Sequence, residues 1–267
     1  MIGEGIHRGF GLEGRVALVM GSTAGIGFRI AEELARAGVK VALNGRNEAR
    51  GKAALARLRG TTSEPIFEAG DSTRYDETGC VVANVVHRLG RIDILVTSGG
   101  ALQPPPALFH ELSPEDFSRV FATQYLARVY PIHAALPYMR DQQHGNIVLV
   151  GTDAARHVTP GESLHGGIGA AIVLLTKALA REFSRWHIRV NGLALTLTSD
   201  TPTYEEIFAH AGFVRDLFTK ALNRFPWGAP PTAEEVARVA LFLASDQSAQ
   251  VTGQTISVNG GLYFGGW

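Results

Sequence analysis

The chain has 267 residues, of which 45% are hydrophobic and 19% are charged, so it is long and apolar enough to bury a large core. Lysine and arginine together number 25, and aspartate and glutamate also number 25. This balance, with no tail of either sign, argues against a nucleic-acid partner. The length predicts one domain spanning residues 1–267.

The single cysteine, Cys80, rules out an internal disulfide framework and is typical of a reducing compartment. It lies in an apolar helical pattern, which predicts a buried structural thiol rather than a nucleophile. No apolar run reaches the roughly 18 residues that span a bilayer, and residues 1–13 lack the hydrophobic segment of a signal peptide. We therefore expect a cytoplasmic protein with no membrane partner and a loose N-terminal lead over residues 1–13.

The first strong pattern is the continuous apolar run 16–20, which is typical of a strand covered on both faces. Further strand-like runs follow at 39–45, 66–71, 92–98, 146–151, 188–195 and 255–259. Helical spacing marks 26–37, 48–58, 75–89, 114–139, 164–186 and 233–244. This strict alternation predicts the α/β class with a doubly wound parallel sheet of the Rossmann type. Ligands of such a sheet bind beyond the carboxyl ends of its strands.

A glycine-rich turn, GSTAGIG at 21–27, joins the first strand to the first helix. Gly21, Gly25 and Gly27 leave no side chains where a pyrophosphate would approach, and the helix directs free N–H groups and its positive dipole end at the same place. Glycines also mark turns that bind nothing, so this motif alone is weak. With the features below, it predicts a dinucleotide site that includes Gly21, Ser22, Thr23, Gly25, Ile26 and Gly27.

The second and third strands end in polar residues that favour NADP(H) over NAD(H). Asn44 and Arg46 stand where an NAD-selective site usually carries a carboxylate, and a guanidinium suits a 2′-phosphate. Alternatively, Arg46 merely begins a solvated basic helix. After the third strand, Asp71 and Ser72 offer an acceptor and a donor for the adenine edge, which is compatible with an N-cap role for the next helix.

The order of these motifs resembles the short-chain dehydrogenase/reductase family over residues 12–261. The matching segments are GSTAGIG, the Asp71 position, TSGG at 97–100, RVN at 189–191 and the ending at 234–261. TSGG stands where the family commonly has Asn-Asn-Ala-Gly, which implies that Ser98, Gly99 and Gly100 border the cofactor. The resemblance also implies a homotetramer, built on the helices 114–139 and 164–186 and on the aromatic ending Tyr263, Phe264 and Trp267.

The family implies a catalytic Asn, Ser, Tyr and Lys, and all four positions differ here. The match of LLTKALARE to the family's helix puts the Tyr position at His165, and the strand 147–150 puts the Ser position at Thr152, thirteen residues earlier. The Lys position is then Gly169, and the Asn position, seven residues after Phe117, is Gln124. The resemblance therefore assigns the oxygen-polarising role to Thr152, the proton-transfer role to His165 and a displaced water site to Gln124.

The changes at His165 and Gly169 are physically consistent with each other. A tyrosine needs a nearby cation to work at neutral pH, whereas histidine titrates near 6.5, and a lysine beside it would discourage its protonation. Gly169, one turn after His165, is also expected to open space beside the nicotinamide ribose. Asp153, His157 and Glu162 are candidates to orient His165. Alternatively, His165 is a capping or surface residue, since HGGIG puts three glycines into the first turns of a helix.

A second departure follows the sixth strand, where residues 195–198 replace the family's Pro-Gly. Residues 198–228 correspond to the family's substrate lid and carry Tyr204, Phe208, Phe213, Phe218, Phe225 and Trp227. These aromatics either pack the lid or favour a bulky, apolar or aromatic substrate. The nine histidines form no ligand-spaced pair with cysteine and no helical His-Glu pattern, so no metal site is expected.

Three functions remain open from the sequence. The first is an NADP(H)-dependent oxidoreductase acting on a carbonyl or alcohol, in which Thr152 polarises the oxygen and His165 moves the proton. The second is a non-redox reaction on the same fold, an elimination or a lyase step. The third is a nucleotide-binding or scaffold protein without chemistry.

Overall fold

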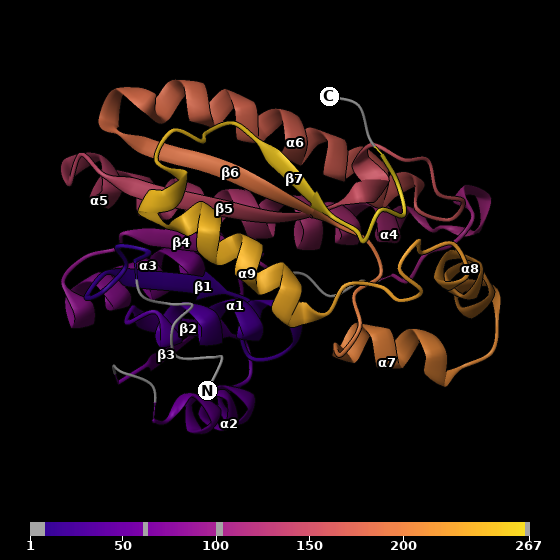
Figure 1. Ribbon diagram of the computed structural model, residues 1–267, viewed down its shortest axis with the longest axis horizontal. Coiled ribbons are helices and arrows are strands. Elements are labelled where there is room, and N and C mark those ends of the chain that lie inside the picture. Colours follow the sequence, from indigo (N-terminus) through magenta and orange to yellow (C-terminus); the bar gives the residue numbers. More distant parts are fainter. Residues whose placement is uncertain (1–8, 61–63, 100–103, 265–267) are drawn as a thin grey trace.

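The computed structural model describes residues 9–60, 64–99 and 104–264, and it confirms the predicted fold class (Figure 1). A seven-stranded parallel sheet has the order β3-β2-β1-β4-β5-β6-β7. The strands are β1 (Val16–Met20), β2 (Lys40–Gly45), β3 (Ile66–Ala69), β4 (Ile94–Thr97), β5 (Gly145–Thr152), β6 (Ile188–Leu195) and β7 (Thr255–Val258).

Helices cover both faces of this sheet, as expected when parallel strands are joined by crossover helices. The α-helices are α1 (Gly25–Arg36), α2 (Glu48–Leu58), α3 (Tyr75–Leu89), α4 (Pro114–Val120), α5 (Ala127–Asp141), α6 (Ser163–Phe183), α7 (Pro202–Ala209), α8 (Phe213–Leu222) and α9 (Ala233–Ala244). Residues of α1, α2 and α9 pack into one apolar cluster, and residues of α3, α5 and α6 pack into another. The sheet therefore lies between two helical layers.

Strand β1 shows why continuous apolar runs mark the central strands. All five of its residues are buried. Ala17 and Val19 face the cluster with α1, whereas Val16, Leu18 and Met20 face the cluster with α3. Because successive side chains of a strand point to opposite faces, a strand covered on both sides must be apolar throughout.

The segment 114–139 is helical, but it is not one regular helix. A π-helical turn, Phe121–Leu126, joins α4 to α5. Such turns are rare and occur often at functional sites. Gln124, one of the residues predicted to act in catalysis, lies in this turn.

The prediction for Cys80 was wrong, because the thiol is exposed. Its helix α3 buries Val81, Val82 and Val85, and Cys80 lies just outside that buried stripe.

In the N-terminal lead, residues 1–8 lie outside the described part of the chain, while Leu12 is only 1% exposed and packs with α1 in the core. The end of the lead is therefore part of the packed fold.

The segment Ser163–Trp186, which contains α6, is long and apolar enough to cross a membrane by length and composition. Its buried residues, including Ile172, Ala180 and Phe183, pack against β5 and β6 within the second apolar cluster. In the most apolar window of this segment, 39% is buried inside the fold, so packing against the sheet accounts for part of its apolar character.

Candidate functional site

A cavity of about 1320 Å³ opens at the carboxyl ends of the strands. Its walls come from the glycine-rich turn after β1, the ends of β2, β4, β5 and β6, and the helices α6, α7 and α8. It brings together most of the residues singled out in the sequence: Gly21, Thr23, Gly25, Ile26, Gly27, Asn44, Arg46, Asp71, Ser72, Ser98, Gly99, Gln124, Thr152 and His165. Gly100 lies outside the described residues, and Ser22 lies beneath the turn rather than on the cavity wall.

The glycine-rich turn is shaped by close backbone approaches. Gly21 has a φ of +66°, and a Cβ there would lie 2.5 Å from the Cα of Gly99. A Cβ on Gly27 would lie 2.5 Å from the carbonyl oxygen of Gly21. The N-cap of α1 is Ala24, which supplies no side-chain acceptor, so the first amides of α1 are left for another partner. This arrangement is suited to an anionic group at the helix N-terminus.

Ser22 and Asn44 tie this turn to β2. Ser22 Oγ donates to the Val19 carbonyl at 2.7 Å and accepts from Asn44 N at 3.0 Å, while Ser22 N donates to the Asn44 carbonyl at 2.9 Å. The Asn44 amide donates to the carbonyls of Glu68 and Gly70 at 3.1 and 3.2 Å. The two side chains are 0% and 1% exposed. Their polar atoms therefore hold the turn in place.

Arg46 lies at the mouth of the cavity with a side chain that is 75% exposed. It does not cap α2, because the Asn47 side chain accepts from Arg50 N at 2.9 Å and supplies that cap. A carboxylate oxygen of Asp71 lies 3.8 Å from the Arg46 guanidinium. Arg46 and Arg50, which both line the cavity, are thus a pair of cations available to a ligand.

Asp71 shapes the turn after β3 rather than the helix that follows. Its Oδ1 accepts from Thr73 N at 2.9 Å and from Thr73 Oγ1 at 2.8 Å, whereas the N-cap position of α3 is occupied by Arg74. The suggested N-cap role of Asp71 and Ser72 was therefore wrong. The second carboxylate oxygen of Asp71 faces Arg46.

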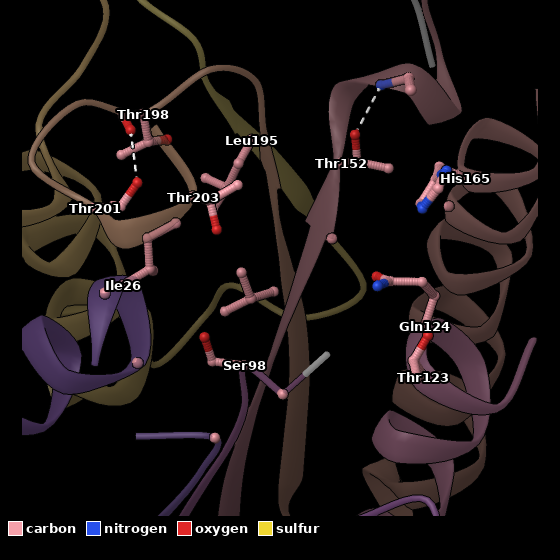
Figure 2. Close-up of a pocket in the computed structure, with 18 of the residues that line it drawn as sticks. Ile26, Ser98, Thr123, Gln124, Thr152, His165, Leu195, Thr198, Thr201 and Thr203 are labelled. Atoms are coloured by element: carbon pink, nitrogen blue, oxygen red, sulfur yellow. Dashed lines mark hydrogen bonds between the residues drawn. The ribbon is translucent and has the colours of Figure 1, made fainter. Parts of the chain in front are cut away.

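Gln124, Thr152 and His165 converge on the far side of the cavity (Figure 2). Thr152 ends β5, and its Oγ1 accepts a hydrogen bond from Ala154 N at 3.2 Å. Because the backbone supplies this donor, the hydroxyl hydrogen of Thr152 remains to be donated elsewhere. The arrangement therefore offers a hydroxyl donor and an imidazole on one side of the same space.

His165 is neither a surface nor a helix-capping residue. It lies in the first turns of α6, is 6% exposed, and Glu162 occupies the N-cap position. Its Nε2 is buried and has no hydrogen-bond partner among the described residues. Burial, together with the charge of Arg128, lowers the pKa of His165 below its ordinary value. At pH 7 the imidazole is therefore neutral.

None of the three residues suggested as partners of His165 makes a hydrogen bond to its ring among the described contacts. Asp153 accepts from Ser257 Oγ at 2.6 Å and from Asn259 Nδ2 at 2.7 Å. The His157 ring stacks on Tyr263 with 3.5 Å between centroids. Burial raises the pKa of the Glu162 carboxyl, whose hydrogen-bond partner is Thr159.

Arg128 was not predicted from the sequence, yet it lines the cavity and is only 7% exposed. Its Nε donates to the Val150 carbonyl at 2.7 Å, and its Nη1 donates to the carbonyls of Gln124 and Thr123 at 2.6 and 3.4 Å. Although the family's lysine is absent, a cation therefore still acts on His165, and the charge of Arg128 discourages protonation of its ring as a lysine would. The available signal was an arginine one helical turn after Gln124, in a mostly apolar stretch.

Gly169 does not open space, contrary to the sequence-based expectation. A Cβ there would lie 2.8 Å from Thr152 Cγ2 and 3.0 Å from Ala155 Cβ. The missing side chain lets α6 approach the end of β5 closely. Gly169 therefore helps to place Thr152 against the helix that carries His165.

Helices α7 and α8 form the remaining wall. Leu197, Ile207, Phe218, Phe225 and Leu262 make a separate apolar cluster here, with Tyr204, Phe208 and Tyr263 packed against it. Of the aromatics in 198–228, Phe218 and Phe225 are buried, whereas Trp227 is 82% exposed. Tyr204 and Phe218 also line the cavity, so packing and ligand contact are combined in this segment.

No group of three or more His, Cys, Asp or Glu side chains is placed to hold a metal ion among the residues that the structure describes. The acidic residue nearest to Thr152 in sequence, Asp153, instead joins β5 to β7.

Replacing Asp153 with alanine is expected to lower the free energy of unfolding by about 2–3 kcal/mol, because the partly buried Ser257 hydroxyl and the buried Asn259 amide each lose an acceptor. Urea unfolding followed by circular dichroism measures this change. The control Asp76→Ala removes a carboxylate that pairs with Arg74 on the surface and should leave stability nearly unchanged. Equal unfolding curves for the two variants would contradict the structural role of Asp153.

Comparison with known proteins agrees with this architecture. A family model described as Enoyl-(Acyl carrier protein) reductase matches residues 21–263. The chain is 31% identical to a 3-oxoacyl-(acyl-carrier-protein) reductase of Chlamydia pneumoniae, over 95% of this chain and 98% of that protein. It is 34% identical to an acetoacetyl-CoA reductase of Rhizobium meliloti, over 94% and 99%.

A solved short-chain type dehydrogenase/reductase from Mycobacterium ulcerans superposes with a TM-score of 0.87 at 27% identity, covering 94% of this chain and 90% of that one. Together with the parallel sheet and the position of its cavity, these similarities show that the chain belongs to the short-chain dehydrogenase/reductase family of oxidoreductases.

Proposed function

We propose that the protein is an NADP(H)-dependent oxidoreductase that interconverts a carbonyl and an alcohol with Thr152 and His165 in place of the family's Ser and Tyr. The observation that carries the proposal is that one continuous cavity runs from the uncapped start of α1 to these two side chains. The relatives named as reductases of 3-oxoacyl and acetoacetyl thioesters support carbonyl chemistry.

The described residues fit a dinucleotide. The amides at the start of α1 and the glycine turn would hold the pyrophosphate, and Arg46 with Arg50 would hold a 2′-phosphate. Asp71 and Ser72 would border the adenine, and Ser98 with Gly99 would border the adjoining part of the cofactor. The orphaned Nε2 of His165, a costly feature in an interior, also fits a site that a ligand completes.

When bound, the nicotinamide supplies or accepts the hydride. Thr152 would donate its hydroxyl hydrogen to the substrate oxygen, since its Oγ1 already accepts from Ala154 N. His165 would deliver a proton to that oxygen during reduction, or remove it during oxidation. Because its pKa is lowered, the neutral ring present at pH 7 is the form needed to remove a proton. Gln124 would hold a water or the substrate beside them.

Replacing Arg46 with aspartate is expected to weaken NADPH binding by about 10- to 100-fold and to strengthen NADH binding, because a carboxylate repels the 2′-phosphate. Titration of the purified protein with each dinucleotide, followed by nicotinamide fluorescence, measures both affinities. Arg59→Asp, at the exposed end of α2, is the matched control for the change in charge. Equal NADPH affinity in the wild type and Arg46→Asp would rule out the role of Arg46.

A second measurement separates redox chemistry from the other functions. Consumption of NADPH with any of a panel of aldehydes, ketones and 3-oxo thioesters supports the oxidoreductase. Product formation without added cofactor would indicate elimination or lyase chemistry instead. Intact dinucleotide binding without turnover on the whole panel would indicate a binding or scaffold protein.

We further propose a homotetramer in the cytoplasm. Exposed aromatic side chains on the α4–α5 segment, among them Phe117, Phe121 and Tyr138, support an interface on these helices. Tyr263 is half-buried and stacks on His157, and Phe264 is 92% exposed, while Trp267 lies outside the described residues. Sedimentation equilibrium measures the assembly state directly.

A further inference from the structure

Arg128 carries a positive charge that no described residue neutralises. It is 7% exposed and lies in α5 below the end of β5. Its described hydrogen bonds all go to backbone carbonyls, and no ion pair joins it to a described carboxylate. Burial alone lowers its pKa to about 10, so it stays protonated at neutral pH. Burying a cation without a counter-charge costs free energy of folding, so the presence of Arg128 here points to a role in binding a ligand.

The hydrogen-bonding capacity of this guanidinium is only partly used. Nε donates to the Val150 carbonyl and Nη1 donates to the carbonyls of Gln124 and Thr123. Nη2 donates to none of the described residues, although Arg128 lines the cavity. Its unused donors are therefore available to a ligand at the end of the cavity that also holds Thr152 and His165.

This position does not belong to the pyrophosphate. The Arg128 side chain is fixed to β5, whereas the glycine-rich turn follows β1, and β4 lies between these strands. Neighbouring strands are about 4.8 Å apart, so the two places are separated by roughly 10 Å across the sheet. The cation therefore lies at the end of the cavity that holds Thr152 and His165, away from the glycine-rich turn.

We propose that Arg128 binds a carboxylate of the substrate through Nη2, next to the carbonyl that Thr152 and His165 act on. One guanidinium with one free nitrogen matches a monoanion better than a phosphate dianion, which needs more donors and more positive charge. This inference rests on the proposed function only for the position of the reacting carbonyl. Binding of an anion by Arg128 does not depend on whether the protein catalyses that reaction.

The test compares oxo acids with their neutral methyl esters by isothermal titration calorimetry. The probes are benzoylformate, pyruvate and acetoacetate, each titrated with and without saturating NADP⁺. At least one acid is expected to bind the wild type about tenfold or more tightly than its ester, because a hydrogen bond between charged groups is lost in the ester. Arg128→Met should abolish this preference, and Arg128→Lys should keep part of it.

Arg119→Met is the matched control, because Arg119 lines the same cavity but lies 3.7 Å from Asp116 with a side chain that is 56% exposed. It should leave the acid preference intact. Equal binding of acids and esters by the wild type, or no acid binding at all, would overturn the proposal without any variant. A preference that survives in folded Arg128→Met would also overturn it. Titrations without cofactor separate this result from a failure of NADP(H) binding.

Discussion

Replacing His165 with glutamine is expected to lower turnover by about 10²- to 10⁴-fold while leaving NADPH affinity within a few-fold of the wild type. The His165 imidazole lies beside Thr152 on the cavity wall, and glutamine has a similar size but cannot gain or lose a proton. Steady-state kinetics on the substrate found in the panel, with dinucleotide titration of the same preparation, measure the two quantities.

The pH dependence adds a second readout for His165. Its pKa is lowered, so oxidation of the alcohol should rise with pH through a midpoint below 6.5 and then level off. Reduction should show the opposite trend, since it needs the protonated ring. His144→Gln is the matched control, because the pKa of His144 is lowered too but the residue precedes β5, at the opposite end from Thr152. A turnover number or midpoint unchanged in His165→Gln would remove the residue from the mechanism.

The same lowered pKa affects folding. In the unfolded chain His165 takes up a proton near pH 6.5, whereas in the folded protein it does so only at lower pH. Stability is therefore fully present above about pH 6.5 and declines as the pH falls towards the folded-state pKa. His144 acts in the same direction, so each single glutamine variant should remove only part of this dependence.

Gly169→Ala is expected to lower turnover by about 10²-fold, because its Cβ would lie 2.8 Å from Thr152 Cγ2 and would displace that side chain. The double variant His165→Tyr/Gly169→Lys, which restores the family's residue types, should be no more active than Gly169→Ala, since lysine brings the same Cβ.

Gly167→Ala is the matched control for Gly169. It lies in the same helix, and a Cβ there has no neighbour within 4 Å. It should keep activity and stabilise the helix by up to about 1 kcal/mol. Full activity of Gly169→Ala, or a gain in activity of the double variant, would show that Gly169 does not position Thr152.

The fold could be predicted because its signals are local and repeated. The apolar run of β1 and the alternation of strands with amphipathic helices follow from burial on both faces of a parallel sheet. The glycine turn was also readable, since Gly21 and Gly27 are positions where any Cβ would clash. The π-helical turn was not, because a single shifted hydrogen bond leaves no composition signal.

The site was less predictable because its electrostatics depend on packing between distant segments. Arg128 approaches His165 only because α5 and α6 lie beside β5, and the spacing of the two residues in sequence contains no trace of this. The glycine at 169 suggested empty space, but the neighbouring chain closes in when a side chain is removed. The exposed Cys80 shows a related limit, since a helix's buried stripe is narrower than its apolar pattern.

The hydrogen bonds of Ser22 and Asn44 that fix the glycine turn affect the entropy cost of binding a ligand there. These two buried side chains already fix the backbone that a phosphate would meet. Binding therefore does not require the loss of conformational entropy that ordering a flexible loop would require. We expect the turn to be preorganised, so that Asn44→Ala would weaken dinucleotide capture through a less favourable entropy rather than through a lost ligand contact.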